Sequence, residues 1–197
     1  MMKEKKATDK IDILYNIVST IRLFFICGVI VSLFFVFIAR KETVRGTSMY
    51  PTLKDDQTVF INVAASYTTS IKRFDVVVAK NYDTDALWVK RVIGLPNETV
   101  EYKNDVLYID GKEVKEPFLD KAYVESMKAQ GERVNFTNDF VSEKLGEDEY
   151  LLVGDNRVNS LDSRNESVGA FKREQIIAKG VLVISPIQEM RYIGNGG

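Results

Sequence analysis

The sequence predicts a mostly β domain that follows one N-terminal transmembrane helix. Residues 23–39 form an uncharged, largely apolar run that is bounded by Arg22 and Arg40. Beyond it, short runs of β-branched and aromatic residues alternate with turn-forming residues, the pattern of antiparallel strands. The 197-residue chain is long enough for one domain with a real hydrophobic core plus an appendage.

The apolar run comes first along the chain and lies at the short end of what crosses a bilayer, which takes about 20 residues. Phenylalanines make it apolar on all sides, which favours a membrane span over the alternative of a buried helix in a soluble core. Upstream apolar residues at three-and-four spacing (Ile13, Leu14, Ile17, Val18 and Ile21) predict that the helix begins near Asp9 and lies partly in the interface.

We expect this segment to remain attached as an anchor. A cleavable signal peptide needs small residues at its cleavage site, and Phe37 stands at the minus-three position relative to Ala39. Five cations precede the span (Lys3, Lys5, Lys6, Lys10 and Arg22) and three follow it (Arg40, Lys41 and Arg45). This bias favours a cytoplasmic N-terminus without deciding the orientation.

The strands are predicted next in order. Strong candidates are 58–63, 75–79, 87–93, a hairpin of 106–109 and 112–114 across Asp110-Gly111, 150–153 and 180–184. The signal fades over 115–148, where 125–131 suggests a short helix, and 172–178 suggests a helical turn. We therefore expect a cytoplasmic and interfacial segment at 1–22, the anchor at 23–39, a β core at 40–98 and 150–197, and an insertion or cap at 99–149.

Composition removes several kinds of chemistry. The chain has no histidine, and its one cysteine, Cys27, lies in the apolar run, so an intrachain disulfide, a Cys/His metal cluster and a histidine-activated nucleophile are excluded. The 27 basic and 28 acidic residues are interleaved, which argues against nucleic-acid binding. A serine or threonine with a lysine base, paired carboxylates, a carboxylate metal site or no catalysis remain.

Ser48 is the first candidate site residue. It lies in the segment 46–53, Gly-Thr-Ser-Met-Tyr-Pro-Thr-Leu, where Pro51 biases Tyr50 toward an extended backbone. Ser48 is therefore expected in a constrained turn rather than a helix. Taken alone, a serine in such a place is usually only a turn residue.

Lys90 is the second candidate. In an alternating strand it shares a face with Trp88 and Val92, so its amine has apolar neighbours. Burial disfavours the charged form and lowers a lysine pKa by as much as ~3 to 5 units, which would let a neutral amine accept a proton. The alternative is a lysine whose stem lies on the sheet while its tip reaches water.

A polar loop over 153–164 is the third candidate, because it holds hydroxyls, amides, two aspartates and two arginines directly after a strand. Such a loop is either a plain surface loop or a set of groups that orients a catalytic side chain. Asp155 and Asp162 each have an arginine within two residues, which favours structural ion pairing over acid and base catalysis.

Together these segments resemble the type I signal peptidases, a family of membrane-bound serine proteases with a serine/lysine dyad. The matching motifs, in order, are Ser-Met-Tyr-Pro-Thr-Leu at 48–53, Arg-Phe-Asp-Val-Val-Val at 73–78, Lys-Arg-Val-Ile-Gly-Leu-Pro at 90–96, and Gly-Asp-Asn-Arg at 154–157 continuing through Ser160-x-Asp162-Ser163-Arg164. Four motifs in order behind an anchor are a specific signal.

The resemblance implies a role for each matching residue. Ser48 would be the nucleophile and donate its backbone N–H to the oxyanion, neutral Lys90 would be the general base, and Ser160 would orient the lysine amine. Asp162 and Arg164 would form a structural ion pair, and Asp155 would help hold the loop. Shallow pockets for small side chains such as alanine would be lined by Met49, Leu53 and Val89.

The resemblance also implies a coiled antiparallel sheet with an insertion between the lysine and Gly-Asp-Asn motifs. The chain would be an endopeptidase that removes signal peptides from exported preproteins, without metal, nucleotide or other cofactor. It would be a single-pass protein of the bacterial cell membrane, with its catalytic domain extracytoplasmic. Nine residues separate Ala39 from Ser48, so an extended chain would keep Ser48 within roughly 30 Å of the span.

Two rival functions and two departures from the family remain. The rivals are a self-cleaving repressor, which would carry a DNA-binding domain in place of the anchor, and a non-catalytic factor assisting surface pilus assembly, which would be expected to lose its serine or lysine. Gly46 stands where some members have a serine that supplies a second oxyanion donor. The usual Leu-Pro-Gly-Asp turn carries Asn97 and Glu98, and asparagine tolerates a left-handed backbone.

Overall fold

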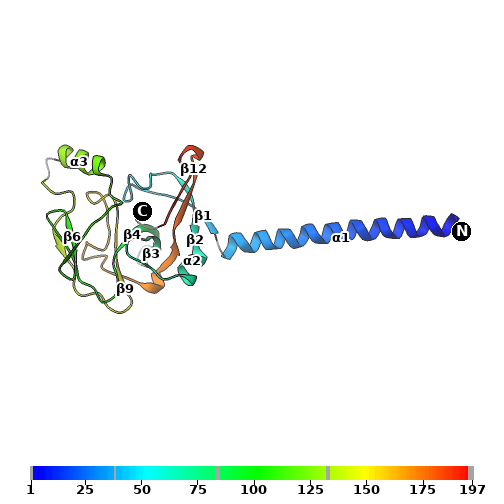
Figure 1. Ribbon diagram of the computed structural model, residues 1–197, viewed down its shortest axis with the longest axis horizontal. Helices are drawn as coiled ribbons and strands as arrows, with labels where there is room; N and C mark the ends of the chain where they lie inside the picture. The colour runs from blue at the N-terminus through cyan, green and yellow to red at the C-terminus, as the bar shows by residue number, and fades with distance from the viewer. Residues whose placement is uncertain (1, 38, 83–84, 132–133, 195–197) are drawn as a thin grey trace. The chain divides into compact units, whose positions relative to one another are not determined.

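The computed structural model describes residues 2–37, 39–82, 85–131 and 134–194 (Figure 1). The chain divides at Ala39 into an N-terminal helical unit and a compact unit that begins at Arg40. Each unit is considered by itself below.

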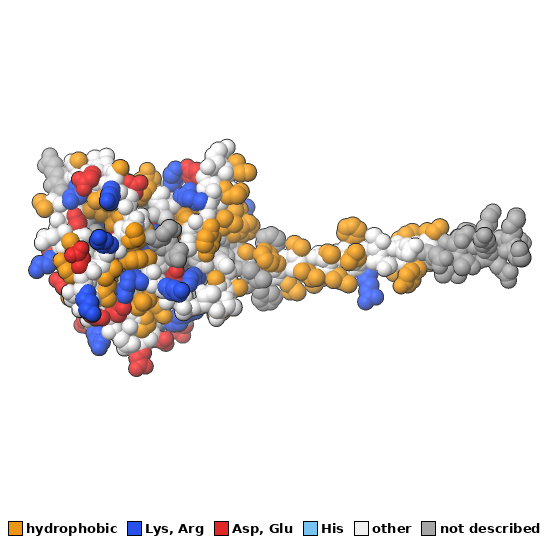
Figure 2. Space-filling view, in the orientation of Figure 1, with side chains coloured by type: hydrophobic (Ala, Val, Ile, Leu, Met, Phe, Trp, Pro, Cys, Tyr) orange, Lys and Arg blue, Asp and Glu red, His pale blue; other side chains and the backbone are white. Residues whose placement is uncertain are grey.

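The N-terminal unit is one continuous helix, α1 (Met2–Phe37). Within it, Ile13–Phe34 is long and apolar enough to cross a membrane, with a mean hydropathy of 2.3, and the apolar stretch is not buried against the rest of the protein. Figure 2 shows hydrophobic side chains along most of the described part of this helix. This stretch begins well before the predicted boundary at residue 23 and includes Arg22, because the upstream apolar residues continue the same helix.

The second unit is mostly β and antiparallel, as predicted, and its strands form three sheets. The first has the order β1 (Ala39–Thr43), β2 (Thr58–Asn62), β12 (Val181–Ser185), β13 (Arg191–Ile193). The second has the order β10 (Phe171–Lys172), β9 (Glu149–Val153), β4 (Leu87–Gly94), β3 (Val76–Lys80), β11 (Ile176–Lys179). The third has the order β7 (Lys112–Val114), β6 (Val106–Ile109), β5 (Val100–Lys103), β8 (Phe140–Val141).

The strong strand candidates correspond to β2, β3, β4, β9, β12 and the β6–β7 hairpin, which confirms those predictions. The expected short helix is α3 (Lys121–Gln130), capped at its start by the Asp120 carboxylate. A second helix, α2 (Val63–Thr68), follows β2 directly and was not predicted. Its N-cap, Asn62, is also the last residue of β2, so the sequence pattern does not show where the strand ends and the helix begins.

The predicted helical turn at 172–178 is mostly wrong. Only the short 3-10 helix η1 (Arg173–Gln175) is helical there, between strands β10 and β11. The edge strand β11 pairs with β3, which is far away in sequence, so tertiary contacts rather than local propensity decide its conformation. A second 3-10 helix, η2 (Ile187–Glu189), precedes β13.

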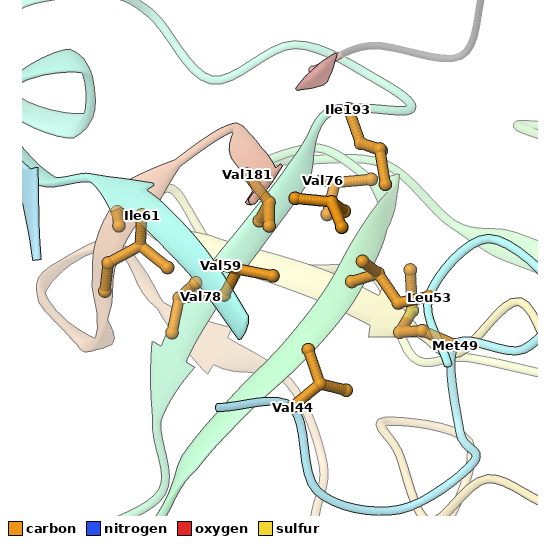
Figure 3. Packing of buried hydrophobic residues seen from close by; sticks show 11 residues of the cluster. Val44, Met49, Leu53, Val59, Ile61, Val76, Val78, Val181 and Ile193 are labelled. Atoms are coloured by element: carbon orange, nitrogen blue, oxygen red, sulfur yellow. The ribbon is translucent and has the colours of Figure 1, made fainter. Parts of the chain in front are cut away.

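Strand β3 lies in the core and is buried on both faces. A strand buried on both faces needs apolar residues at every position, which explains the unbroken Val-Val-Val-Ala run. Val76 and Val78 pack with residues of the first sheet, such as Val59 and Val181, whereas Val77 belongs to a separate cluster with Phe171 and Leu152. Figure 3 shows Met49 and Leu53 side by side in the first cluster, so the segment after Ser48 is anchored in the core.

The third sheet lies entirely within the predicted insertion, 99–149, together with α3. Figure 1 shows β3 and β4 between β2 and β12 on one side and β6 on the other. Val100, Tyr102 and Leu107 of this sheet share a hydrophobic cluster with Ile93 and Val153 of the second sheet. The insertion and the surrounding strands are therefore packed through a common core.

The turn that leads into the third sheet contains one of the departures from the family pattern. Asn97 has φ of 68°, the left-handed conformation expected of an asparagine that replaces glycine. Glu98 accepts a hydrogen bond from the Leu95 N–H at 2.7 Å and pairs with the Arg73 guanidinium at 2.6 Å. The glutamate thus closes the turn through its side chain.

Candidate active site

Ser48 lies in a tight turn between β1 and β2, as its neighbours predict. The Tyr50 N–H donates to the Thr47 carbonyl at 3.0 Å, and the Leu53 N–H donates to the Met49 carbonyl at 2.9 Å. Gly46 enters the turn with φ of +86°, a conformation that favours glycine, and its N–H donates to the Asp55 carboxylate at 2.8 Å. Ser48 itself is half-buried at the surface of this turn.

Lys90 lies in the middle of β4 and is only 4% exposed. Its Nζ atom is 3.2 Å from the Ser160 hydroxyl and 5.5 Å from the centroid of the Trp88 ring. Burial lowers the pKa of the Lys90 amine to about 8; Asp162 and Asp155 oppose this shift and Arg164 adds to it. The Lys90 amine therefore loses its proton at a lower pH than an ordinary lysine does.

Ser48 and Lys90 both line a cavity of about 370 Å³. Its walls come from the segment that ends β1 and runs through the Ser48 turn, from the first half of β4 and from the 153–164 loop, and also from residues of β2 and β3. Of the predicted pocket residues, Met49 and Val89 line this cavity, whereas Leu53 is fully buried in the core cluster and is not among the lining residues. Trp88 and Asn159 contribute to the wall without having been predicted.

Gly154 marks the point where the 153–164 loop crosses the Ser48 turn. A Cβ atom at this position would clash with both the Ser48 carbonyl oxygen and the Ser160 hydroxyl. The Gly154 N–H donates to the Asp162 carboxylate at 3.0 Å. Only glycine lets the loop approach this closely, and the approach brings Ser160 to the Lys90 amine.

Asp155 forms a buried ion pair with Arg91, the residue next to Lys90. The Arg91 Nε and Nη2 atoms donate to the two carboxylate oxygens at 2.8 and 2.7 Å, and the Thr52 hydroxyl donates to the same carboxylate at 2.5 Å. Asp155 therefore connects the loop to β4 and to the end of the Ser48 turn. Asp155 thus forms a structural ion pair, as predicted, but its partner is Arg91 rather than the nearby Arg157, which pairs elsewhere.

Asp162 pairs with Arg164, which agrees with the prediction of a local ion pair. The Arg164 Nε and Nη2 atoms lie 2.8 and 2.9 Å from the carboxylate oxygens. Burial works to raise the pKa of the Asp162 carboxyl, but the hydrogen bonds and charge of Arg164 outweigh it and hold that pKa below its usual value. Asp162 is thus a fixed anion beneath Ser160 rather than a proton carrier.

Arg157 reaches out of the loop to Glu116 of the insertion, 41 residues away. Its Nη2 atom lies 2.6 Å from the Glu116 carboxylate, and the two side chains are 0% and 6% exposed. The Arg157 Nε donates to the Gly154 carbonyl at 3.0 Å, while Glu116 also accepts from the Tyr102 hydroxyl at 2.9 Å. Sequence reasoning missed Glu116, since it lies in a segment without a motif.

The side chains on the wall of this cavity are of the types used in nucleophilic catalysis. A serine hydroxyl and an amine with a lowered pKa line one cavity, and the amine contacts a second hydroxyl. Over the described part of the chain, no group of three or more histidine, cysteine, aspartate and glutamate side chains is placed to hold a metal ion. The cavity therefore contains the two kinds of group that a serine nucleophile and its base require.

Comparisons with known proteins agree on one family. The profile of the family described as signal peptidase, peptidase S26, matches residues 17–185. The chain is 43% identical over 155 residues to signal peptidase I S of Bacillus subtilis (strain 168), covering 79% of this chain and 82% of that protein. It is 37% identical over 191 residues to a signal peptidase I of Bacillus amyloliquefaciens, covering 97% of this chain and 98% of that protein.

A solved structure is also similar to this chain. The crystal structure of a signal peptidase I from Enterococcus faecalis V583 is 34% identical in sequence, covers 56% of this chain and 97% of its own, and has a TM-score of 0.49.

Proposed function

The chain belongs to the signal peptidase S26 family of serine peptidases, and from this premise we propose that it is a membrane-anchored endopeptidase with Ser48 as its nucleophile and Lys90 as its base. Its substrates are exported preproteins, from which it removes the N-terminal signal peptide. The observation that carries the proposal is the buried Lys90 amine, with a pKa of about 8, on the wall of the same cavity as Ser48.

The reaction proceeds by acyl transfer. Ser48 Oγ attacks the carbonyl carbon of the scissile bond while Lys90 Nζ takes the hydroxyl proton. The resulting oxyanion accepts a hydrogen bond from the Ser48 N–H, which helps to stabilise the charge that develops in the transition state. Lys90 then gives its proton to the leaving nitrogen, and the C–N bond breaks to leave an ester on Ser48.

Deacylation uses the same groups in reverse. Lys90, neutral again, takes a proton from a water molecule that attacks the ester carbon. The proton then passes to Ser48 Oγ as the ester bond breaks, and the signal peptide leaves with a new carboxylate terminus. Ser160 keeps the amine in place throughout, because its hydroxyl lies 3.2 Å from Lys90 Nζ.

The cavity gives the peptidase its preference for small side chains. Met49 and Val89 form apolar parts of its wall. The cavity volume of about 370 Å³ must hold every substrate residue that binds there, which leaves little space for each side chain. Leu53 supports this wall from the core, where it packs in the same cluster as Met49. The expected substrates are therefore preproteins with alanine-sized side chains before the cleaved bond.

The helix α1 serves as the membrane anchor, with the N-terminus in the cytoplasm and the peptidase outside the bacterial cell membrane. The apolar length of Ile13–Phe34 supports the anchoring, and the excess of cations before the span supports the orientation. The partners are thus the lipid bilayer and the signal peptides that emerge from it, and the reaction needs no nucleotide and no metal.

The test uses the full chain in detergent with a preprotein panel, and the cut bonds are identified by sequencing the N-termini of the products. Ser48→Ala and Lys90→Ala are expected to abolish cleavage while the circular dichroism of the β domain is kept. Ser126→Ala, on the exposed face of α3, is the matched control and is expected to cut normally. Normal turnover by Ser48→Ala or by Lys90→Ala would overturn the proposed dyad.

A further inference from the structure

Asn156 donates hydrogen bonds to two backbone carbonyls at the candidate nucleophile, those of Thr47 and of Ser48. Its side-chain Nδ2 donates to the Thr47 carbonyl at 3.1 Å, and its backbone N–H donates to the Ser48 carbonyl at 3.0 Å. Asn156 is 4% exposed, and its own Oδ1 accepts from the Asn159 N–H at 3.3 Å. The side chain is therefore fixed at both ends.

The Thr47 contact has a geometric consequence for Ser48. The Thr47 carbonyl and the Ser48 N–H belong to one peptide unit, which is planar and trans, so they point in opposite directions. A donor that fixes the carbonyl therefore also fixes the direction of the N–H. Among the hydrogen bonds of the described residues, the Ser48 N–H has no acceptor, which leaves it available to a ligand.

The same contact changes the strength of the Ser48 N–H as a donor. Hydrogen bonds in a chain polarise one another, so a donor at the carbonyl makes the N–H of that peptide a better donor. The Thr47 carbonyl has two donors, the Asn156 amide and the Tyr50 N–H at 3.0 Å. The Tyr50 bond closes the turn itself, whereas the Asn156 bond comes from a loop more than a hundred residues away.

We propose that Asn156 is a positioning residue for the oxyanion, acting through the Thr47–Ser48 peptide. It aims and polarises the Ser48 N–H so that this donor meets the negative charge of the tetrahedral intermediate. The inference rests on the proposed function, since it assumes that Ser48 is the nucleophile. It assigns to the asparagine a role in the transition state that is separate from the Lys90 and Ser160 contact.

Gly46 supplies no second donor to the oxyanion, so the Ser48 N–H has more of the negative charge to stabilise. Gly46 has no side chain to offer a second donor, and its N–H is already bonded to Asp55. The oxyanion therefore depends on how well the Ser48 N–H is aligned. Donors that are fixed before the reaction stabilise a developing charge without having to reorganise.

The experiment compares Asn156→Ala and Asn156→Asp with the wild-type full chain in detergent. Alanine removes the donor, while aspartate keeps the size and the acceptor for the Asn159 N–H but turns oxygen toward the Thr47 carbonyl. Asn104→Asp is the matched control, because Asn104 lies in an exposed turn of the third sheet with φ of 52°, which aspartate also tolerates. Thermal unfolding is recorded for each variant.

Both Asn156 variants are expected to lower kcat by about 10- to 100-fold with little change in KM, a loss typical of a misaligned donor. Their affinity for a peptide aldehyde, whose adduct with serine carries the same oxyanion, should fall by a similar factor. Affinity for the matching peptide with a reduced CH2–NH bond, which has no carbonyl, should stay within about twofold. Asn104→Asp should behave as wild type.

The pH profile separates this role from general damage to the loop. Ser160 and Asp162 belong to the same loop as Asn156, so a displaced loop would move the pKa of Lys90, whereas Asn156→Ala is expected to leave it unchanged. If kcat is normal in either folded variant, or if both peptide probes lose affinity equally, Asn156 has no such role. The proposed function would still stand in that case if the wild type cleaves the preprotein and Ser48→Ala does not.

Discussion

The amine of Lys90 lies 3.2 Å from the hydroxyl of Ser160, which is 70 residues further along the chain. The two residues come together because Gly154 lets the 153–164 loop pass against the Ser48 turn without a side chain between them. Ser160 is in turn followed by Asp162, whose carboxylate is held by Arg164. The orientation of the lysine amine thus depends on the path of this loop.

Ser160→Ala is expected to reduce kcat by about 10- to 100-fold, because the amine loses the contact that orients it while remaining buried. The thermal unfolding temperature should change less than the rate, since Asp162, which also contacts the Ser160 hydroxyl, keeps its bonds to Arg164 and to the Gly154 N–H. Ser160→Thr keeps the hydroxyl and should recover a large part of the rate. An equal loss of rate in both variants would mean that packing rather than the hydroxyl matters.

The rate of acyl transfer is expected to rise with pH. In the proposed mechanism the active form of Lys90 is the neutral amine. With a pKa of about 8, its neutral fraction increases from roughly a tenth at pH 7 to roughly nine tenths at pH 9. Single-turnover cleavage between pH 6 and 10 should therefore rise about tenfold per unit below pH 8 and level off above it. A flat profile in single-turnover conditions would argue against a lysine base.

Lys90→Met is expected to stabilise the fold while it abolishes activity. The pKa of Lys90 is lower in the folded chain than its ordinary value of 10.5, so the unfolded chain binds more protons between about pH 8 and 10.5. The free energy of unfolding of the wild type should rise with pH through this interval. At pH 7 methionine removes the cost of the buried charge, an effect on the order of 3 kcal/mol.

The stability gain of Lys90→Met is measured by thermal unfolding at pH 7 and at pH 10.5. The increase in Tm over wild type should be several degrees at pH 7 and should shrink at the higher pH, where the wild-type amine is neutral. Equal Tm differences at both values would mean that the amine does not titrate in this interval.

Glu116→Gln is expected to destabilise the protein strongly, by about 3 kcal/mol or more, because it leaves the fully buried Arg157 guanidinium without its anionic partner. The matched control is Asp56→Asn, which breaks the Arg45–Asp56 pair, whose side chains are 76% and 77% exposed. An exposed pair contributes less than about 1 kcal/mol. Urea unfolding of both variants tests the contrast, and similar losses would contradict it.

Gly154→Ala is expected to lower cleavage by at least about 100-fold, because the new methyl group pushes the Ser48 carbonyl and the Ser160 hydroxyl apart. Gly28→Ala is the control, since no atom lies within 4 Å of a Cβ built there. Activity is compared at equal amounts of folded protein, as judged by circular dichroism. A fully active Gly154→Ala variant would show that the loop can move without affecting the site.

The sequence predicted most of the fold because its strongest patterns are local. The alternation in 87–93, the Asp110-Gly111 turn and the apolar helix each depend on neighbouring residues, and the structure contains all three. Strands β1, β5, β8, β10, β11 and β13 were not among the predicted runs, and none of them is longer than five residues. Their conformation depends on distant partners, as with β11 beside β3.

The candidate site follows the same division. The alternating pattern of the strand predicted the apolar surroundings of Lys90, and the ion pair of Asp162 with Arg164 could be foreseen from their spacing. The partners of Asp155 and Arg157 could not be foreseen, because each lies more than 40 residues away and arginine side chains can reach several carboxylates. Which pairs form is decided by packing.

The adjacent positions of Lys90 and Arg91 make the register of β4 a condition for activity. The two cations point to opposite faces of one strand, where Arg91 is permanently charged against Asp155 and Lys90 can lose its proton. Since side chains alternate along a strand, a slip of one residue would exchange the positions of Lys90 and Arg91. The cavity would then contain a guanidinium, which cannot act as a base, and the lysine would lie beside the Asp155 carboxylate, which keeps it charged. The bulge between Val92 and Gly94, where β4 pairs with β9, lies just beyond this pair of residues. A peptidase misregistered there would lack the lysine amine on the wall of the Ser48 cavity.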